Sequence, residues 1–332
     1  MTDSPTMRSP LAWLATRVVL TPRAARWATA SALLASILIV VTGGVVRVTA
    51  SGLGCPTWPA CTTNSFTPTV DTGIHGAIEF TNRALTAVIC AAVGWVVVAA
   101  RLQPTQDRAL LRSAWAQFWI VLLNAVIGGI TVWTGLNPYI VAGHFLAAML
   151  LLTATTISYD IAHRPPPAPG APPRHPPPAV AWVTMLLTAL LITVGTVVTG
   201  AGPHPGDSRE VHRIPVEWLS VTRIHATLAL VVLGVTIACV YLARRQGARA
   251  MYRRSLALLV ILLVQIGIGV YQSVAGLPGA AVVVHLLGSA LIWAGAVRLV
   301  LAGGGGPPRP AGLDGAGPAA VVAAPSTFRA GR

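Results

Sequence analysis

The chain contains no lysine and few charged residues of any kind. Only 10% of its 332 residues are charged, and 54% are apolar. A water-soluble domain of this composition would lack the charged surface that keeps it in solution, so the sequence indicates a membrane protein. All 23 basic residues are arginines, which lie in short clusters between apolar runs. Because these clusters form no stripe with aromatic and polar residues, the net charge of +14 does not indicate a nucleic-acid-binding surface.

Eight apolar runs are long enough to cross a membrane. A helix needs about 20 apolar residues to span a hydrocarbon core of roughly 30 Å. Residues 1–26 lack the apolar core and small-residue cleavage site of a signal peptide, so the first run is expected to remain as a helix. The sequence therefore predicts an all-α membrane protein with eight transmembrane helices. The runs lie near 28–50, 76–100, 112–134, 139–159, 178–200, 220–243, 254–274 and 280–302.

The arginine clusters predict the orientation of the chain. They occupy alternate connections, and positively charged connections face the cytoplasm. The connections at 51–74 and 135–138 contain no basic residue, and the arginines at 201–219 are offset by acidic residues. These three connections are predicted to face outward. Since the number of spans is even, we expect a multi-pass protein of the cell membrane with both termini in the cytoplasm.

The two halves of the chain resemble each other. Residues 48–52, 127–130 and 141–146 match residues 198–202, 266–269 and 282–287 in the same order. Four spans per half preserve orientation, so the halves are predicted to be parallel repeats related by an axis along the membrane normal. Chance similarity among Gly/Val-rich helices is the alternative.

This repeat defines the predicted domains. Each half forms one four-helix bundle, and a Pro-rich segment that cannot continue a helix joins them. The Gly/Pro/Ala-rich C-terminal tail is expected to be disordered. The predicted divisions are a cytoplasmic segment at 1–27, a bundle at 28–162, the linker at 163–177, a bundle at 178–302 and the cytoplasmic tail at 303–332.

Three histidines are predicted to lie at one depth in the membrane. His144, His225 and His285 each follow the start of an inward-running helix by about five residues, within roughly 8 Å of the outer boundary. Ionisable residues inside a membrane usually mark function. Two facing imidazoles of one bundle can supply both axial ligands of a haem iron, and His225 with His285 form such a pair. For any one histidine, a hydrogen bond to a neighbouring carbonyl is the alternative.

The first half differs from the second. The repeat aligns Asn82 with His225, and asparagine is a poor haem-iron ligand. This half therefore offers His144 and a membrane carboxylate, Glu79, which predicts a site that binds a substrate and reacts. Glu79 suits proton transfer beside an oxidised substrate. A structural ion pair of Glu79 with Arg83 or Arg47 is the alternative.

His75 lies at the predicted membrane boundary, on the same helical face as Glu79. It would replace the missing iron ligand if its helix were shifted by two turns. Otherwise it is an interfacial side chain.

Two of the four cysteines lie together in the first outward loop. Cys55 and Cys61 are six residues apart in a Gly/Pro-rich segment on the oxidising side, where disulfides persist. They form either a structural disulfide within the loop or a redox-active pair. The spacing does not separate these two interpretations.

These residues resemble the haem A synthases. The resemblance rests on TGGVVRVTASGLGCP at 42–56, on EFTNR at 79–83 and on the three membrane histidines, and it covers nearly all of residues 28–302. It implies oxidation of the C8 methyl group of haem O to a formyl group, which gives haem A for cytochrome oxidases. The family motif usually has histidine where this chain has Asn82, so bis-histidine ligation in the first half is in doubt.

The resemblance also implies the cofactor, the site and the partners. A haem b is expected between His225 and His285, and the substrate haem beside Glu79 and His144. Haem O synthase and cytochrome oxidase assembly factors are the expected protein partners. Two other functions remain open at this point: a haem b electron carrier, which would not explain Glu79, and a haem transporter without chemistry.

Overall fold

The structure is a computed structural model that describes residues 10–165, 178–208 and 211–304. Eight helices in these ranges are long and apolar enough to cross a membrane. The prediction of an all-α, multi-pass membrane protein with eight spans is therefore confirmed. The long helices are α2 (Pro22–Val48), α3 (Gly73–Arg101), α4 (Arg108–Trp133), α5 (Pro138–Ala162), α6 (Ala179–Ala201), α7 (Trp218–Arg245), α8 (Arg249–Val274) and α9 (Gly279–Val300).

Shorter elements flank the long helices. A six-residue helix, α1 (Pro10–Ala15), precedes α2, and 3-10 turns at Val70–Thr72 and Leu301–Gly304 precede α3 and follow α9. Most of the predicted linker, residues 166–177, and the tail from residue 305 onward lie outside the described residues.

Polar side chains fix where several helices begin. The Asp107 carboxylate accepts the backbone N–H groups of Ala109 and Leu110, at 2.7 and 3.3 Å, before α4. Asn137 accepts the Tyr139 N–H at 3.0 Å before α5, where Pro138 occupies the first turn. These caps satisfy N–H groups that have no partner inside a helix.

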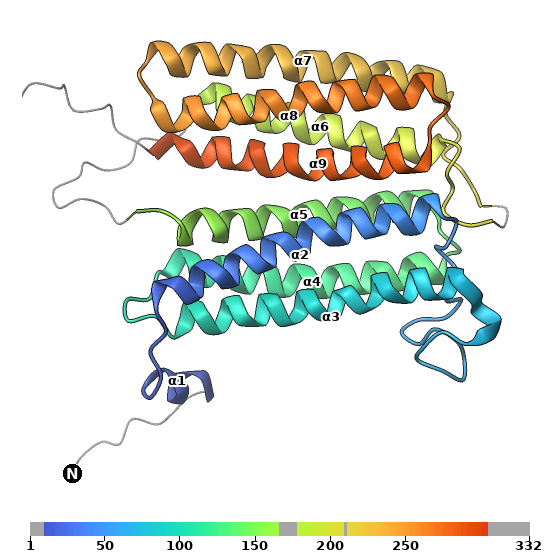
Figure 1. Cartoon of the computed structure of the whole chain (residues 1–332), viewed down its shortest axis with the longest axis horizontal. Helices are drawn as coiled ribbons and strands as arrows, with labels where there is room; N and C mark the ends of the chain where they lie inside the picture. The colour runs from blue at the N-terminus through green and yellow to red at the C-terminus, as the bar shows by residue number, and fades with distance from the viewer. Residues whose placement is uncertain (1–9, 166–177, 209–210, 305–332) are drawn as a thin grey trace, which may run out of the picture.

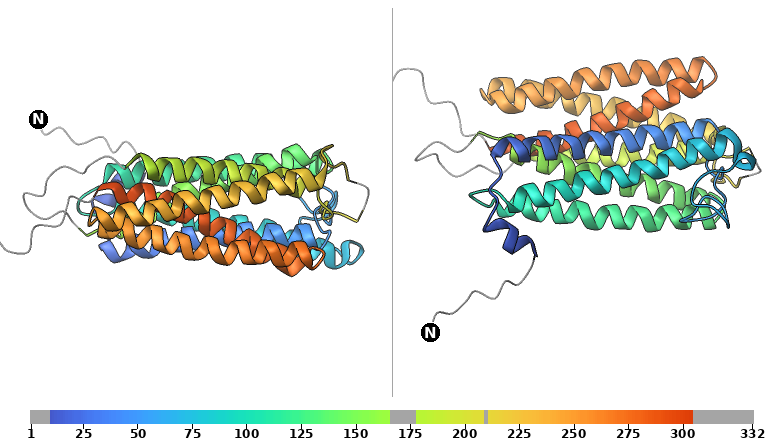
Figure 2. Two further views of the ribbon diagram at one scale, coloured as in Figure 1. Left: turned by 90° about the horizontal axis from the view of Figure 1, so that it is seen from above. Right: turned by 60° about the horizontal axis from the view of Figure 1, so that its bottom comes forward.

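In each half, every one of the four helices contacts two others, so that the four form a ring. In the first half α2 contacts α3 and α5, and α4 contacts α3 and α5; in the second half α6 contacts α7 and α9, and α8 contacts α7 and α9. The views in Figures 1 and 2 show the long helices side by side and roughly parallel to one axis. Helices α2, α5, α6 and α9 join the halves through contacts of α9 with α2 and α5 and of α5 with α6.

Small residues allow close packing within the first half. Ala28 and Ala32 of α2 are fully buried against a cluster that contains Ala99 of α3 and Ala114 of α4. Small side chains let membrane helices approach closely, because association there depends on packing rather than on expulsion of water. Between the halves, the Trp293 indole N–H of α9 lies 3.0 Å from the Met149 carbonyl and 2.8 Å from the Thr153 hydroxyl of α5.

The α4–α5 and α8–α9 turns have the same backbone design. Both contain a Gly-Leu pair with positive φ, Gly135-Leu136 and Gly276-Leu277. The Leu136 N–H donates to Thr131 O at 2.9 Å, and the Leu277 N–H donates to Gln272 O at 2.7 Å. Each of these positions is offset by 141 residues between the halves, as are His144 and His285. The turns favour the predicted repeat.

The molecule has two chemically different ends. At one end, which we call the loop end, lie residues 49–72, 134–137, 202–208, 211–217 and 275–278. At the opposite end, which we call the arginine end, lie residues 102–107, 163–165, 178 and 246–248. The loop end is the end predicted to face outward, and this orientation remains a prediction.

Candidate functional site

The three membrane histidines lie at one level of the structure. His144 is the seventh residue of α5, His225 the eighth of α7 and His285 the seventh of α9, and each of these helices begins at the loop end. At a rise of 1.5 Å per residue, each lies about 10 Å from the start of its helix. The structure therefore brings the three to the same depth.

Two of the imidazoles face each other. The ring centroids of His225 and His285 are 6.4 Å apart, and the ring planes meet at 58°. Both Nδ1 atoms are buried and lack a hydrogen-bond partner among the described residues. An imidazole nitrogen binds a metal ion at about 2 Å, so one ion between two rings places their centroids about 6 Å apart. The spacing fits a single iron between the rings.

Glycines on neighbouring helices accommodate the imidazoles. A Cβ atom at Gly195 of α6 would lie 3.0 Å from His225 Cε1, and one at Gly269 of α8 would lie 3.5 Å from His285 Cε1. A Cβ atom at Gly128 of α4 would lie 3.2 Å from His144 Cε1. Each ring thus lies against the backbone of an adjacent helix, where a side chain would crowd it.

This arrangement corrects one detail of the sequence comparison. That comparison aligned Gly128 with Gly267, but Gly269 is the residue that meets its histidine, and nothing lies within 4 Å of a Cβ atom at Gly267. The alignment was wrong by two residues because Gly/Val-rich helices match at several offsets.

The histidine pair fits a haem better than a bare metal ion. Protein sites for bare transition-metal ions generally need three or four ligands. No group of three or more His, Cys, Asp or Glu side chains that could hold a metal ion occurs within 10–165, 178–208 and 211–304. A porphyrin supplies four nitrogen ligands itself, so two axial imidazoles complete its iron site.

The first half has no second histidine facing His144 in the predicted alignment, and it has Asn82 of α3 instead. The Thr42 hydroxyl of α2 donates to the Asn82 side-chain oxygen of α3 at 2.7 Å. The pair lies at a cavity of about 320 Å³ between α2 and α3, whose lining is mostly apolar. The structure places the exposed His75 ring 2.9 Å from the Ser51 hydroxyl, at the loop end. His75 thus lies beside Ser51 in this structure, and its place at the membrane boundary remains a prediction.

Glu79 is buried in an ion pair. Its side chain is 7% exposed, and Oε1 lies 2.5 Å from Arg83 Nη2. The Cys55 backbone N–H donates to Oε2 at 2.6 Å. Of the two ion-pair partners considered for Glu79, the structure thus shows Arg83, whereas the Arg47 guanidinium donates to Thr199 O of α6 at 2.8 Å. The predicted role of Glu79 in proton transfer remains a prediction.

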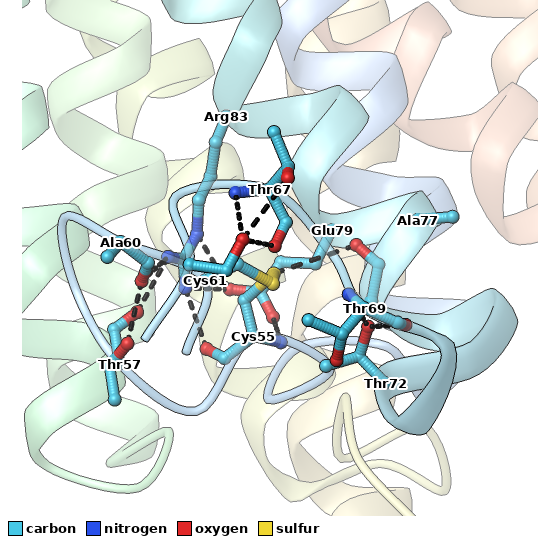
Figure 3. Close-up of a disulfide and its surroundings, with 12 residues drawn as sticks. Cys55, Thr57, Ala60, Cys61, Thr67, Thr69, Thr72, Ala77, Glu79 and Arg83 are labelled. Atoms are coloured by element: carbon cyan, nitrogen blue, oxygen red, sulfur yellow. Dashed lines mark hydrogen bonds and ion pairs between the residues drawn. A yellow bond between two sulfur atoms is a disulfide. The ribbon is translucent and has the colours of Figure 1, made fainter. Parts of the chain in front are cut away.

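Arg83 also binds residues 49–72, which contain Cys55 and Cys61 and which we call the cysteine loop, as Figure 3 shows. Its guanidinium donates to three loop carbonyls, those of Thr57 at 2.7 Å, Cys55 at 2.8 Å and Ala60 at 3.1 Å. Cys55 and Cys61 form a disulfide, and both are fully buried. The disulfide therefore closes a loop around the arginine that binds Glu79. Whether the disulfide is also redox-active remains open.

The cysteine loop contacts both halves of the molecule. Trp58 packs edge-to-face on Trp133 of α4, with ring centroids 5.7 Å apart. The Gly52 N–H donates to Gly206 O at 2.7 Å, in the loop between α6 and α7. Gly54 lies so close to α3 that a Cβ atom there would fall 2.3 Å from the His75 carbonyl oxygen. The loop thus contacts α3 and α4 of the first half and the α6–α7 connection of the second half.

Several curated proteins named Heme A synthase are similar to this chain. The protein of Geobacillus thermodenitrificans is 31% identical over 112 residues, 33% of each chain. That of Lysinibacillus sphaericus is 29% identical over 127 residues, covering 38% of this chain and 41% of the relative. That of Staphylococcus saprophyticus is 24% identical over 219 residues, covering 62% and 70%. The chain spans about a third of the length of the Geobacillus relative it matches.

A family model covers far more of the chain. The model of the COX15-CtaA family, described as cytochrome oxidase assembly protein, matches residues 25–75 and 72–297. The match includes all eight long helices except the first residues of α2 and the last of α9. It also includes the facing histidines, the disulfide and the Glu79–Arg83 ion pair. The chain therefore belongs to the COX15-CtaA family of cytochrome oxidase assembly proteins.

Proposed function

We propose that the protein is a haem A synthase, which oxidises the C8 methyl group of haem O to a formyl group. The observation that carries this proposal is the difference between the halves. The second half has two facing imidazoles, whereas the first has His144, Asn82 and a buried carboxylate at the corresponding end. A function in electron transfer alone would explain neither this difference between the halves nor the buried Glu79–Arg83 pair.

In the second half, His225 and His285 would hold the iron of a haem b. Their centroid spacing of 6.4 Å and the glycines beside them support this assignment. When bound, this haem would accept and pass on single electrons. The two rings are half-buried about 10 Å from the helix starts, and their Nδ1 atoms are fully buried, which would limit the access of bulk water to the iron.

In the first half, His144 would bind the iron of the substrate haem O. Gly128 gives its ring room against α4. Asn82, held by Thr42, would face the substrate from α3 without acting as a strong iron ligand. An incomplete ligand set suits a substrate that must enter and leave.

Glu79 would accept protons released as the methyl group is oxidised. Arg83 and the Cys55 N–H bind both carboxylate oxygens, so the group is held in one orientation while it does so. Arg83 would act through Glu79, as a positioning residue. A carboxylate fixed at the end of an apolar site can take protons toward the loop end, which is predicted to face outward.

The partners follow from the reaction. A haem O synthase would supply the substrate, and assembly factors of cytochrome oxidase would receive haem A. Both exchanges would take place in the cell membrane, with both termini of this chain in the cytoplasm.

Mass analysis of extracted haems tests the proposal. The full chain would be expressed in a host that makes haem O but no haem A, and the pigments would be extracted and weighed. We expect haem A from the wild type and none from Glu79→Gln, with haem b still bound to the variant. Arg101→Gln, at the far end of the same helix, serves as a matched control that should still make haem A.

Other outcomes would assign another function. Two stable b haems without haem A would indicate an electron carrier. Bound haem O without chemical change would indicate a transporter. Haem A formation by Glu79→Gln at the wild-type rate would remove the role proposed for that carboxylate.

A further inference from the structure

A second cluster of charged side chains lies at the arginine end, away from the haem sites. Its centre is Asp160, which is 3% exposed in the last turn of α5. The carboxylate pairs with Arg164 and with Arg254 of α8 at 2.6 Å each, and with Arg298 of α9 at 4.0 Å. One buried acid thus gathers guanidinium groups from both halves of the molecule.

A fourth arginine reaches the same end of α5. Arg26 of α2 donates from Nε to the Ala162 carbonyl at 3.3 Å. Four guanidinium groups and one carboxylate leave three positive charges unbalanced at one helix end. The carbonyl groups at the end of α5 offset only about half a charge.

Among the four arginines of this cluster, Arg298 has the most unused donors. Its side chain is 45% exposed, and its pairing with Asp160 is the loosest of the three. Arginine carries five N–H donors, and within the described ranges none of those of Arg298 makes a hydrogen bond. Its carbonyl accepts from Arg254 Nη1 at 2.6 Å, and its guanidinium lies 5.7 Å from the centre of the Tyr159 ring. The guanidinium lies beside Asp160 and Tyr159, and its N–H donors remain available to a ligand.

We propose that this cluster binds the phosphate of an anionic phospholipid headgroup. The guanidinium fork matches phosphate oxygens, and basic pockets between membrane helices are suited to such headgroups. Three of the arginines lie near the ends of membrane-length helices and Arg164 lies two residues beyond the end of α5, at the level where the headgroups of a bilayer would lie. A bound headgroup would offset the excess charge and hold α2, α5, α8 and α9 together. The proposal does not depend on the haem chemistry.

Lipid titration of the purified full chain tests this site. Native mass spectrometry would count phosphatidylglycerol and phosphatidylcholine bound to the wild type, Arg298→Ala and Arg253→Ala. Arg253 is exposed at the same end of α8, so its variant loses an equal charge outside the cluster. We expect one phosphatidylglycerol to bind in preference to phosphatidylcholine, with affinity about fivefold weaker in Arg298→Ala and unchanged in Arg253→Ala.

Three results would overturn the proposal. They are equal affinity of Arg298→Ala and the wild type, equal binding of the two lipids, and displacement of the lipid by millimolar inorganic phosphate, which would identify a free anion as the ligand. If Arg298→Ala does not fold, Arg26→Ala removes an exposed member of the cluster and must weaken phosphatidylglycerol binding in the same way.

Discussion

Replacing Arg83 by alanine should release the cysteine loop from the first-half site. In the structure this guanidinium binds Glu79 and three loop carbonyls at once. The substitution leaves the buried Glu79 carboxylate with the Cys55 N–H but without a cation. We expect the loop to open more often and to expose the Cys55–Cys61 disulfide to reductant.

The size of the effect follows from burial. The Arg83 and Glu79 side chains are 17% and 7% exposed, so solvent screens their pairing little. Removing one partner of a buried ion pair costs about 3–5 kcal/mol. We take the lower figure because Arg83 is the more exposed partner. A loss of about 3 kcal/mol makes the open loop about a hundredfold more populated.

The rate of disulfide reduction measures this opening. Free thiols are first blocked, since Cys90 and Cys239 are not in a disulfide, and new thiols are then counted by alkylation and mass analysis in excess dithiol. Arg101→Ala is the control, because Arg101 bonds Gln106 at the other end of the same helix. The double variant Glu79→Gln/Arg83→Gln removes both charges and should reduce more slowly than Arg83→Ala. Reduction of Arg83→Ala at the wild-type rate would refute the reasoning.

Further predictions concern the histidine sites and the arginine end. Gly195→Ala places a methyl group 3.0 Å from His225 Cε1 and should lower the haem b content of purified protein; Gly267→Ala, whose added methyl group meets nothing within 4 Å, should leave it unchanged. Equal haem contents would contradict the proposed ligation. Asp160→Asn leaves partly buried arginines without their acid and should destabilise the protein by about 3 kcal/mol, seen as a lower midpoint of thermal unfolding by tryptophan fluorescence. An unchanged midpoint would show that the ion pairs contribute little. Asn82→His should give the first half a second imidazole and convert a haem bound there to a low-spin form, detected by electron paramagnetic resonance. An unaltered spectrum would show that residue 82 does not face the iron.

The membrane spans and the depth of the histidines were predictable from sequence. Both depend on local properties, namely the length of apolar runs and the rise per residue of a helix. His225 and His285 were predicted as a pair because they lie at one depth on two helices of the same half. The structure adds that their rings face each other at 6.4 Å.

The contacts of Arg83 were only partly predictable. Its spacing from Glu79, four residues along one helix, indicated an ion pair. Its bonds to three loop carbonyls were not predicted, because every residue has a carbonyl group and the sequence does not show where a loop folds back. The disulfide was considered, but its closure around Arg83 depends on the fold.

Two other features had sequence signals that were overlooked. The Gly-Leu pairs at 135–136 and 276–277 share the offset of His144 and His285, and would have corrected the alignment of Gly128. Asp160 is an isolated acid near the end of an apolar run that is followed by arginines. Its partners on α8 and α9 lie far away in sequence, so only the fold brings them together.

The central claim is that the two halves hold haem for different purposes, and one paired measurement tests it most directly. Haem b content and haem A formation would be measured for His285→Ala and His144→Ala expressed with a supply of haem O. The account predicts that His285→Ala loses haem b, while His144→Ala keeps haem b and makes no haem A. Retention of haem b by His285→Ala, or normal haem A formation by His144→Ala, would contradict it.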